Sequence, residues 1–577
     1  TSNVRFGVNA GNSIASGGNY NTVVGDNAGT AITTGDENIA IGFNSLLTED
    51  TGKFSVAIGV GALQTQNNDG NNYNTAVGHE AGKLVTTGIQ NTLIGGLAGD
   101  AIQDADYNVA LGYSSLTTNQ LGSKSTAIGT FSLNNQNPAS ATDMFNTAVG
   151  YAAGGVITTG VQNTLIGGLA GDSLTDADNN VAIGASALTS DTLGSSTIAI
   201  GFGALYSQNF TSATNTYNVA VGHNAGLLVT TGVQNTLIGG LAGDSLTDAD
   251  ANVAIGYAAL SANTIGSKSI AIGNGSLFRQ NPASAVDMYN VSIGHSAGEF
   301  ISTGVQNVIV GGLAGDALTV GTRNVVLGTG ALTADTKGSR STALGYYALA
   351  SQNFTTADDI YNTAVGFNAG YAVTTGVNNT FVGGLAGDGT DDGSSNTAVG
   401  YLALSANAGD SNCAFGINAL LSCTGDANAA FGNNASLNVS SGTNNIGIGR
   451  DALRTGSPGG AQTTASNKIG LGDENISSAH IQVDWTVASD ARDKTDFTAL
   501  DLGLEFVKDL QPVTYKWDKR SQYGDKTADD YDLTSQTPDG THKEDWLDIG
   551  FKAQEVEALE IAAGYNKDNK TNLVSSH

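Results

Sequence analysis

The feature that most constrains the fold is a short motif that recurs at a nearly fixed interval along most of the chain. Its five-residue core, as in NTAVG, NTLIG and NVAIG, ends on a glycine that stands at Gly25, Gly42 and Gly59 and recurs as far as Gly449. From Gly78, three 17-residue steps are followed by one 21-residue step, and that set repeats as a unit of 72. Such a period indicates a repeat architecture in which each copy packs on its neighbours.

Each core is predicted to form a short strand. A large aliphatic residue precedes the glycine and a β-branched residue stands two positions earlier, so these two share one face and a small residue lies on the other. The glycine predicts a tight turn into a second short segment. We expect copies stacked about 4.8 Å apart to bury the aliphatic face, which gives a mostly β chain with a glycine-rich β-solenoid or β-roll shaft.

An asparagine begins nearly every core, as at Asn74, Asn91 and Asn108. Stacked copies would place these side chains in a row, and we expect a structural ladder of amides bonded along the axis. In every fourth repeat Ser or Thr replaces the first asparagine of the core, at Ser55, Ser125, Thr197, Ser269 and Ser341.

Each 21-residue step carries an insertion such as RQNPASAVDMYN or SQNFTTADDIYN. The insertions contain Met144, Phe145, Phe210, Tyr217, Met288, Tyr289, Phe354 and Tyr361. Exposed aromatic rings among Asn, Thr and Ser would suit stacking against a sugar ring, whereas the favoured alternative is that these side chains cap a local hydrophobic patch.

The shaft offers two weak candidates for a metal. GGLAGD recurs with Asp100, Asp172, Asp244, Asp316 and Asp388, often before T-D-A-D as at Asp176 and Asp178. Calcium is one interpretation, but the spacing is not that of the twelve-residue calcium loop, and Asp is a common turn residue. His79, His223 and His295 follow the anchor glycine where other copies have Tyr151 or Phe367, which favours a surface aromatic over a required ligand. We therefore predict no metal site and no cofactor, with calcium as the alternative.

The charge excludes some partners. The formal charge of −29 divides into −21 over residues 1–487 and −8 over residues 488–577, which disfavours nucleic acid and anionic membranes. No apolar run approaches the roughly 20 residues that span a bilayer. Because no catalytic grouping is recognisable in the shaft, we do not expect it to be an enzyme.

The repeats over residues 3 to about 455 resemble the head repeats of trimeric autotransporter adhesins, whose N-S-V-A-I-G units form a β-roll in each of three chains. The period here is longer, and the 21-residue step is absent from that family. The resemblance implies a homotrimer.

After Gly449 the repeat decays, and near residue 488 tryptophan, lysine and long charged side chains appear. We therefore predict a repeat domain over 1–455, a connecting segment over 456–488 and a small α+β domain over 489–577. Residues 500–513 and 550–564 are predicted to form amphipathic helices.

Three motifs characterise this last domain: S-D-A-R-D-K at 489–494, L-x-P-V-x-Y-K-W at 510–517 and G-F-x-A-Q-E-V-E at 550–557. In this order they resemble the C-terminal intramolecular chaperone of the endosialidase type, found on bacteriophage tail spikes and fibres. That family trimerises, guides assembly of the β-rich fibre before it, and cuts itself off through a serine–lysine dyad. It usually continues into a long helical segment, so we expect the domain to be C-terminally truncated here.

The resemblance places the catalytic nucleophile on Ser489 and its base on Lys494, with the cut next to Ser489 and Asp490. An amine can deprotonate a hydroxyl if burial or a neighbouring cation lowers its pKa, and Arg492 is placed to help. Gln554 and Glu555, in the third motif, are further supporting candidates. Without the later motifs, Ser489 would be interpreted as a helix cap.

The sequence thus predicts a virion appendage: a homotrimeric phage tail fibre that attaches to a host-surface glycan or protein and joins other tail proteins through a missing N-terminal part. The alternatives are a bacterial trimeric surface adhesin and a glycan-degrading tailspike.

Overall fold

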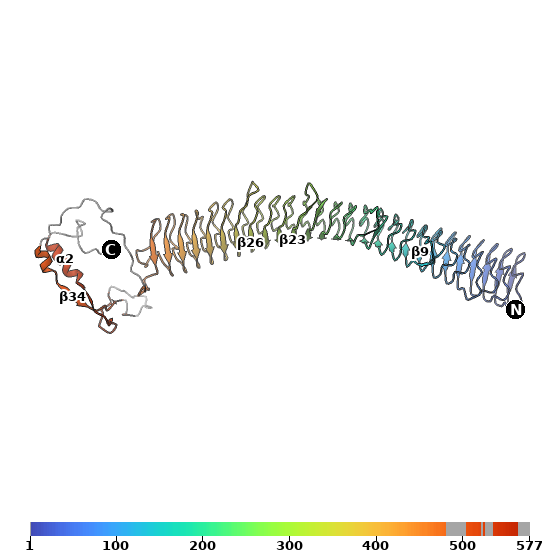
Figure 1. Ribbon diagram of the computed structural model, residues 1–577, viewed down its shortest axis with the longest axis horizontal. Coiled ribbons are helices and arrows are strands. Elements are labelled where there is room, and N and C mark those ends of the chain that lie inside the picture. The colour runs from blue at the N-terminus through green and yellow to red at the C-terminus, as the bar shows by residue number, and fades with distance from the viewer. Residues whose placement is uncertain (1, 481–503, 521–522, 525–534, 564–577) are drawn as a thin grey trace. The chain divides into compact units, whose positions relative to one another are not determined.

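The computed structural model describes residues 2–480, 504–520, 523–524 and 535–563, which fall into two compact units. The first unit comprises Thr1–Arg454 and Ala461–Gly470, and the second Thr455–Gly460 and Leu471–His577. The first unit is a β-solenoid whose main sheet has 27 strands, one from each coil, so the predicted fold class is confirmed for the shaft (Figure 1).

The main sheet consists of β1 (Val4–Phe6), β2 (Thr22–Val24), β3 (Ile39–Ile41), β4 (Val56–Ile58), β5 (Thr75–Val77), β6 (Thr92–Ile94), β7 (Val109–Leu111), β9 (Thr126–Ile128), β11 (Thr147–Val149), β12 (Thr164–Ile166), β13 (Val181–Ile183), β15 (Ile198–Ile200), β17 (Val219–Val221), β18 (Thr236–Ile238), β19 (Val253–Ile255), β21 (Ile270–Ile272), β23 (Val291–Ile293), β24 (Val308–Val310), β25 (Val325–Leu327), β26 (Thr342–Leu344), β27 (Thr363–Val365), β28 (Thr380–Val382), β29 (Thr397–Val399), β30 (Cys413–Phe415), β31 (Ala429–Phe431), β32 (Ile446–Ile448) and β33 (Ile469–Leu471).

The glycine that ends each five-residue core, which we call the anchor glycine, explains why the motif recurs so strictly. Successive strands pair in parallel without a shift, so Thr75 lies opposite Thr92. Gly78 has a φ of +146°, and a Cβ atom on it would lie 2.3 Å from the carbonyl oxygen of Gly95 in the next coil. A side chain would therefore both strain the backbone and prevent the coils from approaching, so only glycine fits.

The core of the shaft combines large and small side chains whose places alternate between neighbouring coils. The central residue of each strand points inward, as Ala76, Leu93 and Ala110 do, and all three are fully buried. Where Leu93 occupies the core, a Cβ atom on Gly99 would lie 2.8 Å from its side chain. In the following coil the strand residue is Ala110 and the position equivalent to Gly99 is Leu116, so the packing stays dense.

The outward face of the main sheet corrects one prediction. We expected stacking to bury the face that carries the large aliphatic residues, but in the single chain these side chains point outward, and the central strand residues lie in the core. The outward side chains exposed by more than a third are Val4, Phe6, Ile39, Leu111, Ile166, Ile198, Ile238, Ile293, Val308, Val325, Leu327, Phe415, Phe431, Ile448, Ile469 and Leu471. The reason is the path of the coil: the central residue of each strand packs against other buried residues of the same coil, such as Ala81 and Val85, and alternation turns its two neighbours outward.

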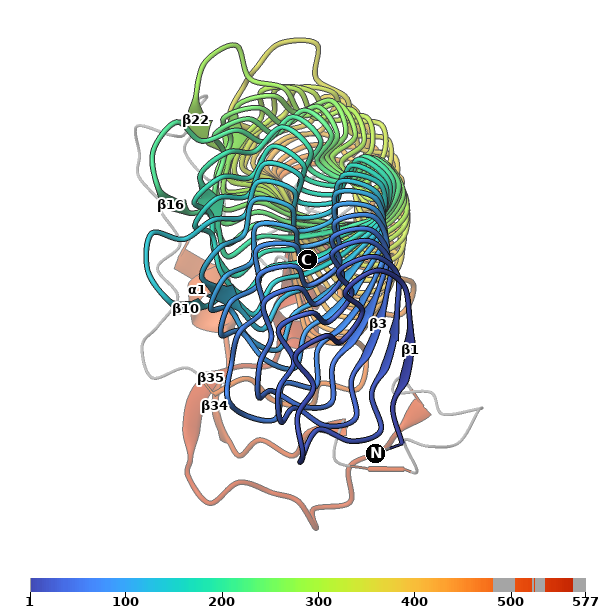
Figure 2. The same cartoon turned by 90° about the vertical axis from the view of Figure 1, so that its right-hand side faces the viewer.

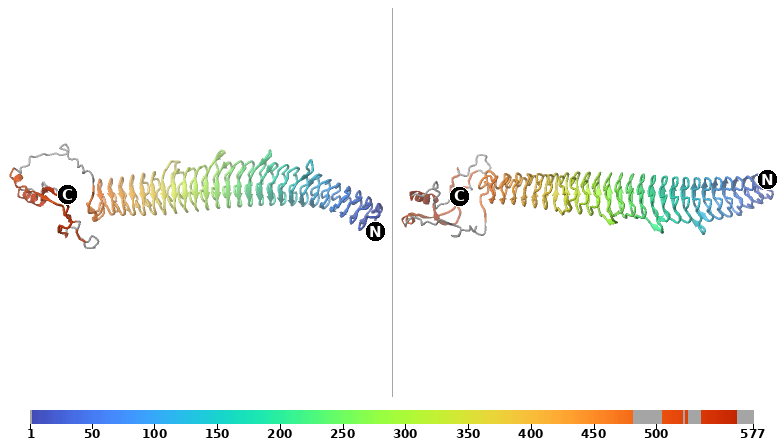
Figure 3. Two further views of the ribbon diagram at one scale, coloured as in Figure 1. Left: turned by 60° about the horizontal axis from the view of Figure 1, so that its bottom comes forward. Right: turned by 90° about the horizontal axis from the view of Figure 1, so that it is seen from above.

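The 21-residue steps form side loops on the shaft. In three of these loops a short strand pairs in parallel with a short strand of the preceding coil: β10 (Thr142–Asp143) with β8 (Gly122–Ser123), β16 (Thr214–Asn215) with β14 (Gly194–Ser195), and β22 (Val286–Asp287) with β20 (Gly266–Ser267). The loops project from the sides of the coils (Figure 3), and an end-on view places β10, β16 and β22 on the opposite side from β1 and β3 (Figure 2).

The second unit contains α1 (Leu504–Asp509), β34 (Pro512–Tyr515), β35 (Asp548–Phe551) and α2 (Ala553–Ala562). β34 and β35 pair antiparallel. The two predicted helices are therefore each shorter than expected and joined to a strand, and for the first of them the reason is that Pro512 lacks the N–H that a helix interior requires. Among the described residues, no helix has the length and apolar character needed to cross a membrane.

Candidate functional site

The predicted cleavage site cannot be built from the structure. Ser489, Asp490, Arg492 and Lys494 lie in segment 481–503, outside the described residues. Their proposed roles therefore remain predictions from the sequence.

The two supporting candidates lie on α2. Gln554 and Glu555 are both exposed, and the Lys552 ammonium lies 2.7 Å from the Glu555 carboxylate. Glu555 also borders a cavity of about 270 Å³ that is lined by Asp509, Leu510, Gln511, Phe551, Lys552, Glu555, Val556, Ala558 and Leu559. The cavity lies between α2 and the link from α1 to β34, and much of its lining is apolar.

In the described part of the second unit, most apolar side chains are exposed in a single chain. Ile549 is 80% exposed, and Trp546, Leu547, Phe551 and Ile561 are each more than half exposed. Within the described parts of 504–563, Glu560 is the one buried residue. The described part of this unit thus presents an exposed apolar surface of the kind that marks an interaction site.

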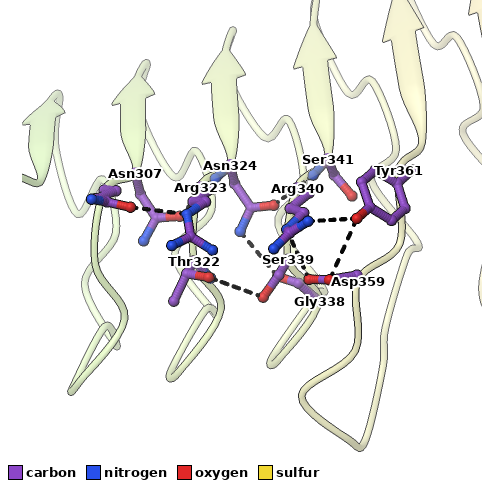
Figure 4. Close-up of polar contacts among 11 residues, drawn as sticks. Asn307, Thr322, Arg323, Asn324, Gly338, Ser339, Arg340, Ser341, Asp359 and Tyr361 are labelled. Atoms are coloured by element: carbon purple, nitrogen blue, oxygen red, sulfur yellow. Dashed lines mark hydrogen bonds and ion pairs between the residues drawn. The ribbon is translucent and has the colours of Figure 1, made fainter.

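The asparagine ladder of the shaft is confirmed, with a different bonding pattern from the one expected. The Asn307 side-chain oxygen accepts the backbone N–H of Asn324 at 3.0 Å (Figure 4). The Asn307 amide nitrogen donates to the Gly321 carbonyl at 2.9 Å. Each side chain thus forms hydrogen bonds with a backbone N–H and a backbone carbonyl of the following coil. These buried backbone groups therefore have partners inside the core.

The ladder continues through every fourth coil, where Ser or Thr replaces Asn, by means of residues that were not predicted from the sequence. At Ser269 the short side chain leaves space that Gln280, from the insertion, fills. The Gln280 amide nitrogen donates to the Ser269 hydroxyl at 3.0 Å, and its oxygen accepts from Asn290 at 2.9 Å. Gln66, Gln136, Gln208 and Gln352 hold the equivalent places. In the sequence, each Ser or Thr that replaces a ladder asparagine is followed eleven residues later by a glutamine, and this spacing could have predicted the contact.

Three buried carboxylates pin the starts of the insertions. Asp335 accepts the backbone N–H of Gly338 at 3.0 Å and the Gln352 amide at 2.6 Å. Burial raises the pKa of Asp335 above its ordinary value, against the effect of these hydrogen bonds, and it does the same for Asp191 and Glu49. Asn119 and Asn263 hold the equivalent places in the other two copies.

The candidate metal residues are engaged in other contacts. Asp100, Asp172, Asp244, Asp316 and Asp388 each accept a hydrogen bond from a Ser or Thr hydroxyl seventeen residues later. Asp178 accepts the backbone N–H of Val161 at 2.8 Å, and Asp176 accepts from Thr159. His79, His223 and His295 are not buried, and the His223 ring stacks on Phe202 with 5.5 Å between centroids. Within the described residues no three His, Cys, Asp or Glu side chains converge as metal ligands would.

The insertion side chains fall into two groups, one buried and one exposed. Met144, Met288, Phe210 and Phe354 are buried beneath the loops, as the hydrophobic-patch interpretation predicts. Phe145, Tyr217, Tyr289 and Tyr361 are between 49% and 57% exposed, so their rings are accessible to a ligand.

Comparison with known families gives one match. Residues 489–565 match the family described as the chaperone of endosialidase. This supports the predicted chaperone domain at the C-terminal end of the chain. No curated protein and no solved structure matches the chain.

Proposed function

We propose that the chain is part of a phage tail fibre, in which a homotrimeric β-solenoid shaft attaches to the host surface and a C-terminal chaperone directs assembly. The observation that carries this proposal is the match of residues 489–565 to the chaperone family on a chain whose preceding unit is a 27-strand repeat. A uniform repeat needs such help, because three copies can pair in several registers that conserve most contacts.

The exposed faces of both units support a trimer. The outward apolar side chains of the main sheet recur from coil to coil over all 27 strands, a row about 120 Å long at the strand spacing. Apolar surface on that scale marks an interaction site. The second unit also exposes apolar side chains, at Trp546, Ile549 and Phe551, which indicates an interaction surface there too. Other copies of the chain would satisfy both.

We further propose that the chaperone is released once, by attack of the Ser489 hydroxyl on the adjoining peptide bond. Lys494 takes the hydroxyl proton as base, the acyl–oxygen bond forms as the C–N bond breaks, and the amine leaves with that proton. Water then hydrolyses the ester. Removal of the guide after assembly would make the shaft slow to unfold, because the route back to three separate chains is lost.

The test is the intact mass of the expressed chain beside Ser489→Ala and Lys494→Ala. We expect the wild-type chain to yield a shaft fragment that ends near residue 489, and both variants to stay full length while still forming trimers. The matched control is Ser478→Ala, a serine before the motif, which should be cut normally. A wild-type chain that stays intact, or variants cut at the same bond, would refute the dyad.

A further inference from the structure

The residue two positions before each main-sheet strand forms an exposed longitudinal row, which we call the pre-strand row. Along one repeat it contains Lys268, Tyr289, Gln306 and Arg323, followed by Arg340 and Tyr361 in the next. Members of the row have left-handed backbone, with φ of 59° at Lys268 and 50° at Tyr289. Because the backbone conformation repeats, side chains of very different kinds leave the shaft from the same edge, one per coil.

The row carries the same chemical pattern in four successive four-coil repeats. A cation or small polar residue comes first, an exposed aromatic ring follows in the next coil, and an amide follows in the one after. The four clearest groups are Lys124–Phe145–Gln162, Ser196–Tyr217–Gln234, Lys268–Tyr289–Gln306 and Arg340–Tyr361–Asn378. Each aromatic ring stands at the point where an insertion rejoins the shaft.

A carboxylate from the insertion completes three of these groups and fixes their geometry. Arg340 lies 3.0 Å from Asp359 and 5.4 Å from the Tyr361 ring centroid, and it donates to the Tyr361 hydroxyl (Figure 4). Lys268 lies 2.6 Å from Asp287, with its ammonium 5.4 Å from the ring of Tyr289. The aromatic ring is thus held in place by neighbouring charges and stays about half exposed.

Lys124, Asp143 and Phe145 repeat the arrangement, with 2.6 Å between the charges and 5.2 Å from the ammonium to the ring centroid. In the Tyr217 group the charged pair is replaced by Ser196 and Asn215, 3.5 Å apart. The position of the ring is therefore kept where the charges are not, which indicates that the ring itself is the recurring element.

From this geometry we propose that each group is a subsite for one neutral sugar of a host-surface polysaccharide. The aromatic ring offers an apolar face to the C–H face of a pyranose. The carboxylate accepts hydrogen bonds from sugar hydroxyls, and the amide both donates and accepts. Because the cation and carboxylate cancel and residues 1–487 carry −21, an acidic polysaccharide would be repelled.

The spacing suits a polymer. Successive groups are four coils apart, roughly 19 Å at the strand spacing. A repetitive polysaccharide would engage several groups at once, so subsites that are weak alone add up to firm attachment. This inference rests on the proposed attachment function and names the ligand and the surface.

The row is a poor candidate for the contact between copies. Charged side chains are depleted at the centres of protein interfaces, and the pre-strand row together with its carboxylates concentrates Lys, Arg and Asp. The outward strand positions, in contrast, carry aliphatic and aromatic side chains and threonines, and none of them is charged. Variants in the row should therefore leave the oligomeric state unchanged.

The test compares two triple variants of the full chain. The first, Tyr217→Ala/Tyr289→Ala/Tyr361→Ala, removes three rings of the row. The control, Tyr206→Ala/Phe300→Ala/Tyr371→Ala, removes three rings of 39% to 45% exposure elsewhere on the coils. Both are assayed for oligomeric state by light scattering, for binding to an array of purified neutral and acidic bacterial surface polysaccharides, and for binding to a panel of intact bacteria.

We expect the wild type and the control to bind a neutral polysaccharide, and the row variant to lose at least tenfold in apparent affinity at an unchanged oligomeric state. Binding that survives in the row variant, binding to acidic polysaccharides alone, absence of binding on the array, or a changed oligomeric state would each overturn the inference. If the protein still binds intact cells in those cases, the proposed attachment function is retained and the proposed sugar subsites are rejected. If no cells are bound either, the attachment function fails as well.

Discussion

The shaft and the C-terminal unit solve the problem of burial in opposite ways. In the shaft, Ala76, Leu93 and their equivalents are fully buried within one chain, and each ladder asparagine satisfies backbone groups of the next coil. In the described part of the second unit, Ile549 and its apolar neighbours remain exposed. The shaft therefore carries its own core within one chain, whereas the described part of the second unit presents apolar surface that another copy of the chain could cover.

The difference teaches what each unit contributes to assembly. The shaft has order along its axis but little that distinguishes one repeat from the next, because a shift by one four-coil repeat matches strand to strand and insertion to insertion. The second unit occurs once per chain. If its exposed face meets two other copies, it aligns the chains at one end, and the equivalent repeats then pair in the one remaining register.

The largest effect is expected where the second unit is most exposed. Ile549→Asp places a carboxylate on the apolar face, where burial would cost several kcal/mol. We expect the yield of trimer, measured by size-exclusion chromatography with light scattering, to fall at least tenfold, while Lys543→Asp at an exposed polar position has little effect. Normal trimer formation by the Ile549→Asp chain would contradict the proposal that the exposed face of the second unit aligns the chains.

A smaller, local effect is expected in the shaft, and adjacent glycines provide the matched pair. In Gly167→Ala the new Cβ atom would lie 2.5 Å from the Gly184 carbonyl oxygen at a φ of +140°, whereas at Gly168 nothing lies within 4 Å. Gly167→Ala should cost about 3 kcal/mol or more, and Gly168→Ala less than about 0.5 kcal/mol. Hydrogen exchange of the amides in β12 and β13 measures both, and equal protection in the two variants would contradict the packing.

The smallest effect concerns pH. Burial raises the pKa of Asp335 in the folded chain, so the folded state holds this proton to a higher pH than the unfolded state. Asp335 therefore lowers stability at neutral pH, and the penalty disappears as pH falls through the raised folded pKa toward the ordinary value of 3.8.

Asp335→Asn copies the residue already present at Asn119 and Asn263 and removes this contribution. The melting temperature of the wild type relative to the variant should rise when pH is lowered from 7 to about 4.5, by an amount worth at most about 1 kcal/mol. A difference that is constant with pH would show that Asp335 does not titrate in this range.

Much of the shaft could be predicted from the sequence because its determinants are local and repeated. The spacing of Gly25, Gly42 and Gly59 predicted the coil length, and the asparagine before each core predicted the ladder. The role of Gln280 was missed because its partners, Ser269 and Asn290, are eleven residues before it and ten after it, and only coil stacking brings all three together. Of the predicted site, Ser489 and Lys494 still rest on the sequence, whereas Gln554 and Glu555 are placed on α2.

The sequence by itself determined the period, the stacking of the repeats and the position of the chaperone domain, because these depend on residue spacing and on motifs that are contiguous in the chain. The tertiary structure decided which side of each strand faces inward. Alternation separates two faces but does not say which is buried, and the winding of the coil turns Ala76 and the equivalent Leu93 inward and leaves Val77 on the outer face. It also brought Arg340, Asp359 and Tyr361 together, since their contacts form only when one coil lies on the next.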